Sequence, residues 1–440
     1  MTARRTADPR LRAASAAVFA VFALNGFNFS SWASRLPAVR DALGLSPEQM
    51  GALLLVGAIG SLVALPLSGM VVTRLGARRT VLAFALVNAV GLALAAVGVA
   101  AGVVLVVASG AVVFGVGTGT WDASMNLEGA AVEQKLGHTV MPRYHAGFSI
   151  GTAVGAAVAA AAAWLGVPVG VHIPVAVLAS SIGVAFAVRR FLPEPEASTA
   201  AAAHPTGSPQ GDATGADPAT AVEAPSRARR AFGSWLEPRT LLIGLVVLAA
   251  ALTEGSANDW VALAVVDGFG TTDAIGALAF GIFVTAMTAM RFFGTTLLDR
   301  HGRIVTLRLC AVLSLIGLGM FTLVPEGLLW LALIGIVLWG MGAALGFPVG
   351  MSAASDDPAH AAGRVSVVAT IGYSAFLAGP PLLGLLAGAV GYRHALLAIA
   401  IPVLVGLFVL HAVRPPAPDE PPTGSAGVPG SASDRGASGN

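Results

Sequence analysis

The chain has 440 residues, of which 56% are hydrophobic and only 11% are charged. Soluble domains carry about 25% charged residues, so most of this exterior must face something other than water. The single cysteine, Cys310, excludes a disulfide framework and a cysteine-based metal site.

Twelve continuous apolar runs follow one another along the chain. Helices of about 20 apolar residues can cross the roughly 30 Å hydrocarbon core. The runs do not alternate between apolar and polar residues, which excludes a membrane barrel. They cover 13–36, 51–72, 80–100, 103–121, 146–165 and 167–188, then 240–265, 274–298, 304–324, 328–349, 365–390 and 395–413. The predicted fold class is an all-α polytopic membrane protein with 12 transmembrane helices.

The first run is interpreted as a spanning helix and not as a secretion signal. It is too long for the apolar part of a signal peptide, and it contains Asn25, Asn28 and Trp32. Most basic residues fall in loops on the same side as the N-terminus. Because such residues remain on the cytoplasmic side, we expect both termini there and the protein in the plasma or inner cell membrane.

Polar, proline-rich segments divide the chain into two halves. The segment around 193–238 is rich in Ala, Pro, Thr, Ser and Gly, and so is the C-terminal tail. Such segments cannot bury enough apolar surface to offset their ordering entropy. We therefore predict a cytoplasmic N-terminus (1–12), a six-helix half (13–190), a flexible cytoplasmic linker (191–238), a second six-helix half (239–413) and a disordered cytoplasmic tail (414–440).

The loops that follow the second run of each half resemble each other. The first contains Thr73, Arg74, Gly76 and Arg78, and the second contains Asp299, Arg300, Gly302 and Arg303. Paired glycines also recur, as Gly115 and Gly117 in the fourth run and as Gly340 and Gly342 in the tenth. Two related halves with a site between them are typical of transporters.

The second of these loops resembles the signature loop of the major facilitator superfamily. The match is Asp299-Arg300, any residue, then Gly302-Arg303. The resemblance covers about 13–190 and 240–413, and it implies two pseudo-symmetric six-helix bundles with a cytoplasmic gating loop in each. The first loop departs from the pattern, because Thr73 stands where the aspartate belongs. Threonine can cap a helix, but it cannot form a charged latch.

A narrower resemblance begins at the end of the fourth run. The segments Trp121-Asp122-x-x-x-Asn126 and Met141–Gly151 resemble a bacterial inner-membrane group that includes the membrane protein of rhizopine gene clusters. They are more distantly similar to the fucose–proton symporters. The resemblance implies that Asp122 lies in the cavity, whereas hydropathy alone places it at a cytoplasmic helix end. The carboxylate that the symporters carry late in their first helix is absent here, so fucose specificity is not carried over.

Ionisable groups inside the predicted helices are candidates for proton coupling. Each costs roughly 2.5–3.5 kcal/mol at a helix centre, so each is expected to have a structural or functional role. Glu254 lies deep in the seventh run, and a buried carboxyl group there suits reversible protonation. The alternative is a neutral acid that is hydrogen-bonded to a helix neighbour. Asp122 and His145 form the second candidate, as a pair that relays protons or simply ties two helix ends together.

Polar and aromatic side chains on the same helices are candidates for the substrate cavity. Asn25, Asn28 and Trp32 share a helix face, and amides both donate to and accept from sugar hydroxyls. Contacts between helices are the alternative for the amides, and anchoring at the membrane interface is the alternative for Trp32 and Trp260. The remaining cavity candidates are Trp121, Asn126, Asn258 and Trp260.

Four other charged residues are assigned structural or solvent-exposed places. Arg291 is expected to find a structural partner toward the cytoplasmic loop. Asp259 is expected to meet water near the outer end of its helix. Glu128 and Glu133 are expected to be solvated loop acids.

The leading hypothesis is a secondary transporter that moves a small polar solute by alternating access. The solute would be a sugar or a sugar-like compound, and protons would be the coupling ion. The chain has no phosphate-binding glycine loop and no metalloprotease motif, so we expect no enzyme activity, cofactor or metal. The expected partners are the solute, protons and the lipid bilayer, with no nucleic acid, and the expected state is a monomer. The alternatives are an exporter of drugs or toxic metabolites and a transport-inactive membrane receptor or scaffold.

Overall fold

The computed structural model describes residues 8–138, 140–193, 233–357 and 360–415. Most of the predicted linker (191–238), most of the predicted tail (414–440) and residues 1–7 lie outside the described residues, so those predictions remain as stated. Within the described ranges the chain is helical throughout and contains no strand.

The first half consists of seven α-helices and a short 3-10 turn. They are α1 (Pro9–Ala33), α2 (Leu36–Leu43), α3 (Pro47–Leu75), α4 (Ala77–Ala101), α5 (Val104–Leu136), α6 (Met141–Trp164), α7 (Val169–Ala187) and η1 (Val188–Arg190). Short α2 turns along the end of the bundle and ends at Gly44, whose φ of 61° is left-handed. Gly102 and Gly137 end α4 and α5 in the same way.

The second half repeats the plan with longer continuous helices. Its elements are η2 (Ser234–Leu236), α10 (Pro238–Phe269), α11 (Asp273–Leu323), η3 (Glu326–Leu328), α12 (Leu329–Ala343), α13 (Gly346–Ala354), α14 (Ala361–Ala395), η4 (Leu396–Ile399), α15 (Ala400–Val409) and η5 (Leu410–Val413). The predicted tenth helix, 328–349, is divided between α12 and α13.

Ten helical segments of the described chain are long and apolar enough to cross a membrane, and two of them turn back on themselves. Asp273–Leu323 and Gly363–Val413 each contain 51 residues. As a straight helix, 51 residues would extend about 75 Å, more than twice the hydrocarbon core. Each is broken at a glycine with positive φ, Gly302 (φ 75°) and Gly391 (φ 81°). The chain therefore makes the twelve crossings that the apolar runs predict.

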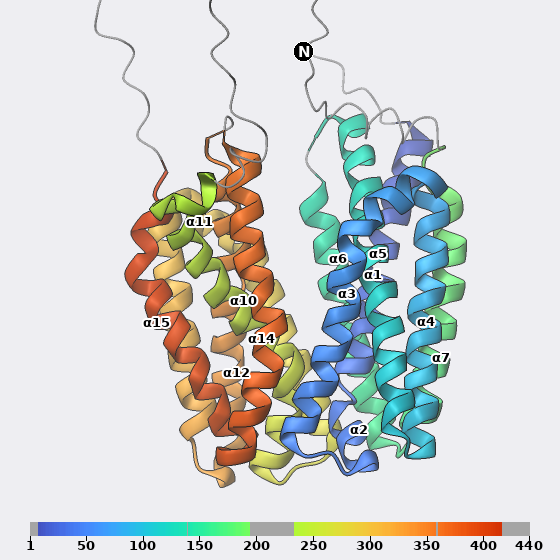
Figure 1. Cartoon of the computed structure of the whole chain (residues 1–440), viewed down its shortest axis with the longest axis vertical. Coiled ribbons are helices and arrows are strands. Elements are labelled where there is room, and N and C mark those ends of the chain that lie inside the picture. Colours follow the sequence, from blue (N-terminus) through green and yellow to red (C-terminus); the bar gives the residue numbers. More distant parts are fainter. Residues whose placement is uncertain (1–7, 139, 194–232, 358–359, 416–440) are drawn as a thin grey trace, which may run out of the picture.

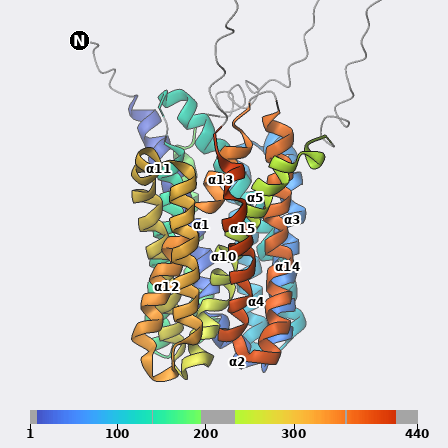
Figure 2. The same cartoon turned by 90° about the vertical axis from the view of Figure 1, so that its left-hand side faces the viewer.

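The two halves stand side by side as two helical bundles (Figure 1, and turned by 90° in Figure 2). The start of α1 lies at the upper end in Figure 1, which we call the terminal end, and α2 lies at the opposite end, which we call the α2 end. Large apolar side chains such as Phe186, Phe293 and Phe408 are 60%, 75% and 81% exposed on the outer surface. A surface of this kind is suited to hydrocarbon and not to water.

The halves interlock closely where α3 meets α14 near the α2 end. A Cβ atom built on Gly51 would lie 2.6 Å from the carbonyl oxygen of Pro380, and one on Gly384 would lie 2.7 Å from that of Pro47. Only glycine permits helix backbones to approach this closely. Arg40 of α2 adds an ion pair of 2.6 Å to Asp267 of α10. The α2 end is therefore closed by contacts between the halves.

One boundary differs substantially from its prediction, because α5 continues well past Trp121 to Leu136. Glu128 consequently lies on a helix, is 1% exposed and accepts a hydrogen bond of 2.8 Å from the backbone N–H of Leu192. Glu133 accepts bonds of 2.6 and 2.7 Å from the N–H groups of Val140 and Met141, at the start of α6. The prediction of solvated loop acids is wrong, because hydropathy does not register acids that bind backbone N–H groups.

Candidate functional site

A cavity of about 350 Å³ lies between the two halves, around the middle of the long helices. Helices α1, α2, α3 and α5 line it from the first half, and α10 and α14 line it from the second. Its aromatic side chains are Phe29, Trp32, Phe114, Tyr373 and Phe376, and its other polar side chains are Ser61, Thr118, Asp122 and Asp259. Since both halves supply its walls, a movement of one half against the other would change its access.

Each half contributes one carboxylate to this cavity, Asp122 from α5 and Asp259 from α10. Within the described chain, neither carboxylate receives a hydrogen bond or an ion pair. The amide of Asn126 donates to the backbone carbonyl of Asp122, at 2.9 Å, and not to its side chain. A charged carboxylate in an apolar cavity is costly unless a proton or another cation neutralises it.

The position of Asp122 agrees with the family resemblance and corrects the placement by hydropathy alone. Asp259 also differs from its expected place, because it lines the inner cavity and not a water-exposed helix end. The sequence contains a pattern that could have indicated a cavity position for Asp259. Both halves place an acid next to a tryptophan, as Trp121-Asp122 and as Asp259-Trp260.

The predicted amide stripe of α1 does not line the cavity. Asn25 and Asn28 are each 1% exposed. Asn25 donates to the Met125 sulfur at 3.7 Å, and Asn28 donates to Asn88 at 3.0 Å. Asn88 in turn donates to the Thr118 hydroxyl at 2.9 Å. These amides therefore connect α1, α4 and α5, and they reach the cavity only indirectly, through Thr118.

Of the three candidate tryptophans, Trp32 lines the cavity and the other two do not. Trp121 is fully buried within the first half, and Trp260 is 1% exposed and packs on Tyr392 with ring centroids 5.5 Å apart. Successive residues of a helix point about 100° apart, so the acid beside each tryptophan can face the cavity while the indole faces the bundle. Stacking of a sugar on Trp121 or Trp260 is not possible in this arrangement.

Glu254 and Arg291 form an ion pair within the second half. Arg291 of α11 donates to Glu254 of α10 at 2.9 Å and to the carbonyl oxygen of Ala344 at 3.2 Å. The structural partner expected for Arg291 is thus Glu254 and not a group of the cytoplasmic loop. Neither side chain lines the cavity, and Asn258, one turn beyond Glu254, does not line it either.

His145 and Asp122 are not hydrogen-bonded to each other within the described structure. The His145 ring lies edge-on to Phe22, with centroids 5.2 Å apart. His145 lies near the start of α6, a helix that also packs against α11 of the other half. The proton-relay role predicted for the pair has no direct contact to support it.

Comparison with known proteins places the chain in a family. The model of the Major Facilitator Superfamily matches residues 18–378 and 260–436. The chain belongs to the Major Facilitator Superfamily. An uncharacterised transporter y4wD of Sinorhizobium fredii is 31% identical over 88% of this chain and 97% of its own length. The membrane protein MosC of Rhizobium meliloti is 26% identical over 91% and 90%. Both the superfamily resemblance and the narrower bacterial resemblance are confirmed.

Solved transporters share the fold at low sequence identity. The nucleoside transporter NupG matches with a TM-score of 0.68 and 15% identity, over 92% of this chain and 99% of its own. The E. coli fucose:proton symporter FucP matches with a TM-score of 0.52 and 14% identity, over 91% and 98%. The predicted all-α fold of twelve helices is confirmed. Because the superfamily consists of transporters, the chain is a multi-pass membrane transporter and not an enzyme.

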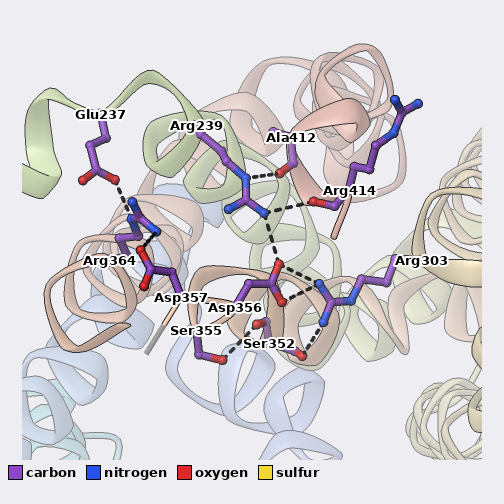
Figure 3. A network of polar contacts seen from close by, with 10 residues as sticks. All are labelled: Glu237, Arg239, Arg303, Ser352, Ser355, Asp356, Asp357, Arg364, Ala412 and Arg414. Carbon is purple, nitrogen blue, oxygen red and sulfur yellow. Dashed lines mark hydrogen bonds and ion pairs between the residues drawn. The ribbon is translucent and has the colours of Figure 1, made fainter. Parts of the chain in front are cut away.

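The superfamily loop of the second half anchors a polar network at the terminal end (Figure 3). Arg303 donates to both carboxylate oxygens of Asp356, at 2.8 and 2.9 Å, and to the Ser352 hydroxyl at 3.1 Å. Arg239 adds a bond of 3.1 Å to the same carboxylate and bonds the carbonyl oxygens of Ala412 and Arg414. Asp356 thus connects the loop at Gly302 with α10, α13 and the end of η5.

A second part of this network surrounds Arg364, at the start of α14. Arg364 donates to Glu237 at 2.6 Å and to Asp357 at 3.2 Å, and Thr240 donates to Glu237 at 2.8 Å. Partial burial alone would raise the pKa of Glu237. The hydrogen bonds from Arg364 and Thr240 outweigh it, however, and hold this pKa below its usual value.

The loop of the first half contains no comparable network among its described contacts. The Thr73 hydroxyl donates back to the carbonyl oxygen of Gly69 at 2.7 Å, so it does not cap α4. Arg74 and Arg78 are exposed. In the second loop Asp299 and Arg300 are exposed as well, and Arg303 is the residue that contacts Asp356. The two copies of the loop therefore differ in structure as well as in sequence.

Proposed function

We propose that this transporter is a secondary active carrier that moves a small polar solute through the cavity between its halves. The observation that carries the proposal is a central cavity to which each half contributes one carboxylate that has no partner among the described side chains. A solute bound there contacts both halves at once, so its binding can be linked to their relative movement. NupG and FucP, which share this fold, are described as a nucleoside transporter and a fucose:proton symporter.

Alternating access would proceed by rocking of the halves. In the present structure the α2 end is closed by the α3–α14 contacts and by the Arg40–Asp267 ion pair. Opening that end would separate these contacts. The basic loops around Arg78 and Arg303 lie toward the terminal end, and their charge supports a cytoplasmic placement of that end in the cell membrane. We propose that the protein works as a monomer, with the cavity formed by the two halves of one chain.

Protons are the proposed coupling ion, and Asp122 is the proposed proton carrier. An acid that carries protons must alternate between charged and neutral forms as the cavity changes its exposure. Among the residues that the structure describes, the Asp122 carboxylate faces the cavity without a partner, whereas Glu254 is held by Arg291. This geometry favours Asp122 for the coupling role over Glu254 and over the His145–Asp122 pair, and Asp259 lines the same cavity.

Two solute classes follow from the cavity walls. A sugar or sugar-like solute could use the hydroxyls of Ser61, Thr118 and Tyr373. The five aromatic side chains favour a more apolar solute and support the alternative of drug or metabolite export. Both classes are compatible with the same cycle of alternating access.

Proteoliposomes that contain a pH-sensitive dye test this function. D-xylose, uridine and benzyltrimethylammonium would be added separately under an imposed pH gradient. We expect a proton flux that depends on at least one of these solutes, and an at least tenfold slower flux in the Asp122→Asn variant. The matched control is Glu326→Gln, an exposed acid outside the cavity. Absence of solute-dependent flux with all three compounds, or unchanged flux in Asp122→Asn, contradicts the proposal.

A further inference from the structure

The charges on the cavity wall are all of one sign. Its described lining contains Asp122 and Asp259 but no arginine, lysine or histidine. Arg291 and His145, the nearby basic candidates, lie outside this lining, and Arg291 is already paired with Glu254. Within the described residues, neither carboxylate of this low-dielectric cavity has a protein counter-charge. The missing positive charge must therefore come from something that enters the cavity.

The remaining wall is suited to an apolar or aromatic body. Phe29, Trp32 and Phe114 line it from the first half, and Tyr373 and Phe376 line it from the second. Aromatic faces also attract ammonium groups directly. Apart from the two acids, hydrogen-bonding side chains are few. A neutral polyhydroxylated solute would leave several of its hydroxyls unpaired, which weakens its binding.

The volume of the cavity limits the size of its occupant. About 350 Å³ lies at the lower end of the range for small-molecule sites, roughly 300–1,000 Å³. Such a space holds a compound with one ring and a short polar or charged group. It does not hold a peptide or a large multi-ring compound without further opening.

We infer that the solute is a small organic cation, an amine or quaternary ammonium compound, whose positive group pairs with Asp122 or Asp259 while its apolar part contacts the aromatic wall. This inference rests on the proposed transport function, and it names the substrate class of the same cavity. One carboxylate belongs to each half, so either half can supply the counter-charge of the cation. The cation also competes with protons for the same two acids.

Competition with protons gives the inference a pH dependence. Asp122, Asp259 and Tyr373 are the titratable groups in the described lining. His145 on α6 and the Glu254–Arg291 pair on α10 and α11 are the ionisable groups on adjoining helices. Protonation of the two aspartates removes the attraction for the cation. Binding is therefore expected to weaken as the pH falls, and the His145→Gln variant is expected to keep this dependence.

Calorimetric titration of the purified full chain with benzyltrimethylammonium tests the inference, with benzyl alcohol as the neutral control. We expect saturable binding of the cation, no comparable binding of the alcohol, and at least tenfold weaker cation binding in Asp122→Asn or in Asp259→Asn, whichever carboxylate holds the cation. The exposed-acid variant Glu326→Gln should bind like the wild type. Unfolding temperatures of the unliganded variants show whether any loss of binding reflects misfolding. Equal binding of the alcohol, or unchanged cation affinity in both Asn variants, overturns the inference.

Failure of the inference can be distinguished from failure of the transport function. If D-xylose or uridine drives proton flux while benzyltrimethylammonium neither binds nor moves, the substrate class is wrong and the transport function stands. If the cation binds but none of the three compounds is transported, the substrate class stands and secondary transport is contradicted.

Discussion

Among the described residues, an acidic side chain at the terminal end is paired with arginines, whereas the acidic side chains of the central cavity are unpaired. Asp356 is bonded by Arg303 through both oxygens and by Arg239 through one of them. Asp122 and Asp259 have no such partner among the described residues, although they lie deeper in the membrane portion. A fully paired acid connects helices, whereas an unpaired acid in a cavity retains its capacity to bind something else. This contrast separates the structural acids of the chain from those that we propose to act in transport.

The largest expected effect is the loss of Asp356. Replacing it with Asn leaves Arg303 and Arg239 without their shared counter-charge, and we expect a loss of about 3 kcal/mol of stability. The Asp122→Asn variant should be as stable as the wild type or more so, because it removes an unpaired charge from an apolar cavity. Unfolding temperatures in detergent, measured on both variants, check the prediction. Equal destabilisation by the two substitutions would refute the contrast.

A smaller effect is expected for the Glu254–Arg291 pair. Glu254→Gln should cost about 2 kcal/mol of stability, since Arg291 loses its partner while both side chains are partly exposed. The double variant Glu254→Gln/Arg291→Gln should recover part of this loss, because no unpaired charge remains. A double-mutant cycle on the unfolding temperature measures the coupling. Additive losses would show that the pair contributes nothing as a pair.

A still smaller effect on stability is expected from a substitution in the loop of the first half. Thr73→Asp restores to the first half the aspartate that the superfamily pattern expects. Thr73 lies in the last turn of α3, and a negative charge near a helix C-terminus costs about 0.3–1 kcal/mol, so a slight fall in unfolding temperature is expected. The matched substitution Thr73→Asn introduces the same shape without the charge. A fall of the same size in both variants would assign the effect to the lost bond from the Thr73 hydroxyl to Gly69 and not to charge.

The twelve crossings could be predicted because hydropathy is a property of long segments. The end of α5 could not be predicted, because in the sequence Glu128 and Glu133 resemble the solvated acids of a loop. Their backbone partners, Leu192, Val140 and Met141, are known only from the folded structure. The direction in which a single side chain points could not be predicted from the sequence either. Trp121 and Asp122 are neighbours in the chain, yet one faces the bundle and the other the cavity. The partner of Glu254 could not be identified either, because Arg291 comes from another helix.

The smallest expected effect is pH-dependent and concerns Glu237. Its pKa is lower in the folded protein than in the unfolded chain, so the folded state is stabilised whenever this group is ionised. That contribution is present above the unfolded pKa of about 4.3 and disappears as the pH falls through the lower, folded value. The difference in unfolding temperature between the wild type and Glu237→Gln should therefore be constant from pH 7 to about pH 5, and it should shrink below about pH 4. A difference that grows on acidification would reverse the sign and contradict the role of Arg364 as the stabilising partner of Glu237.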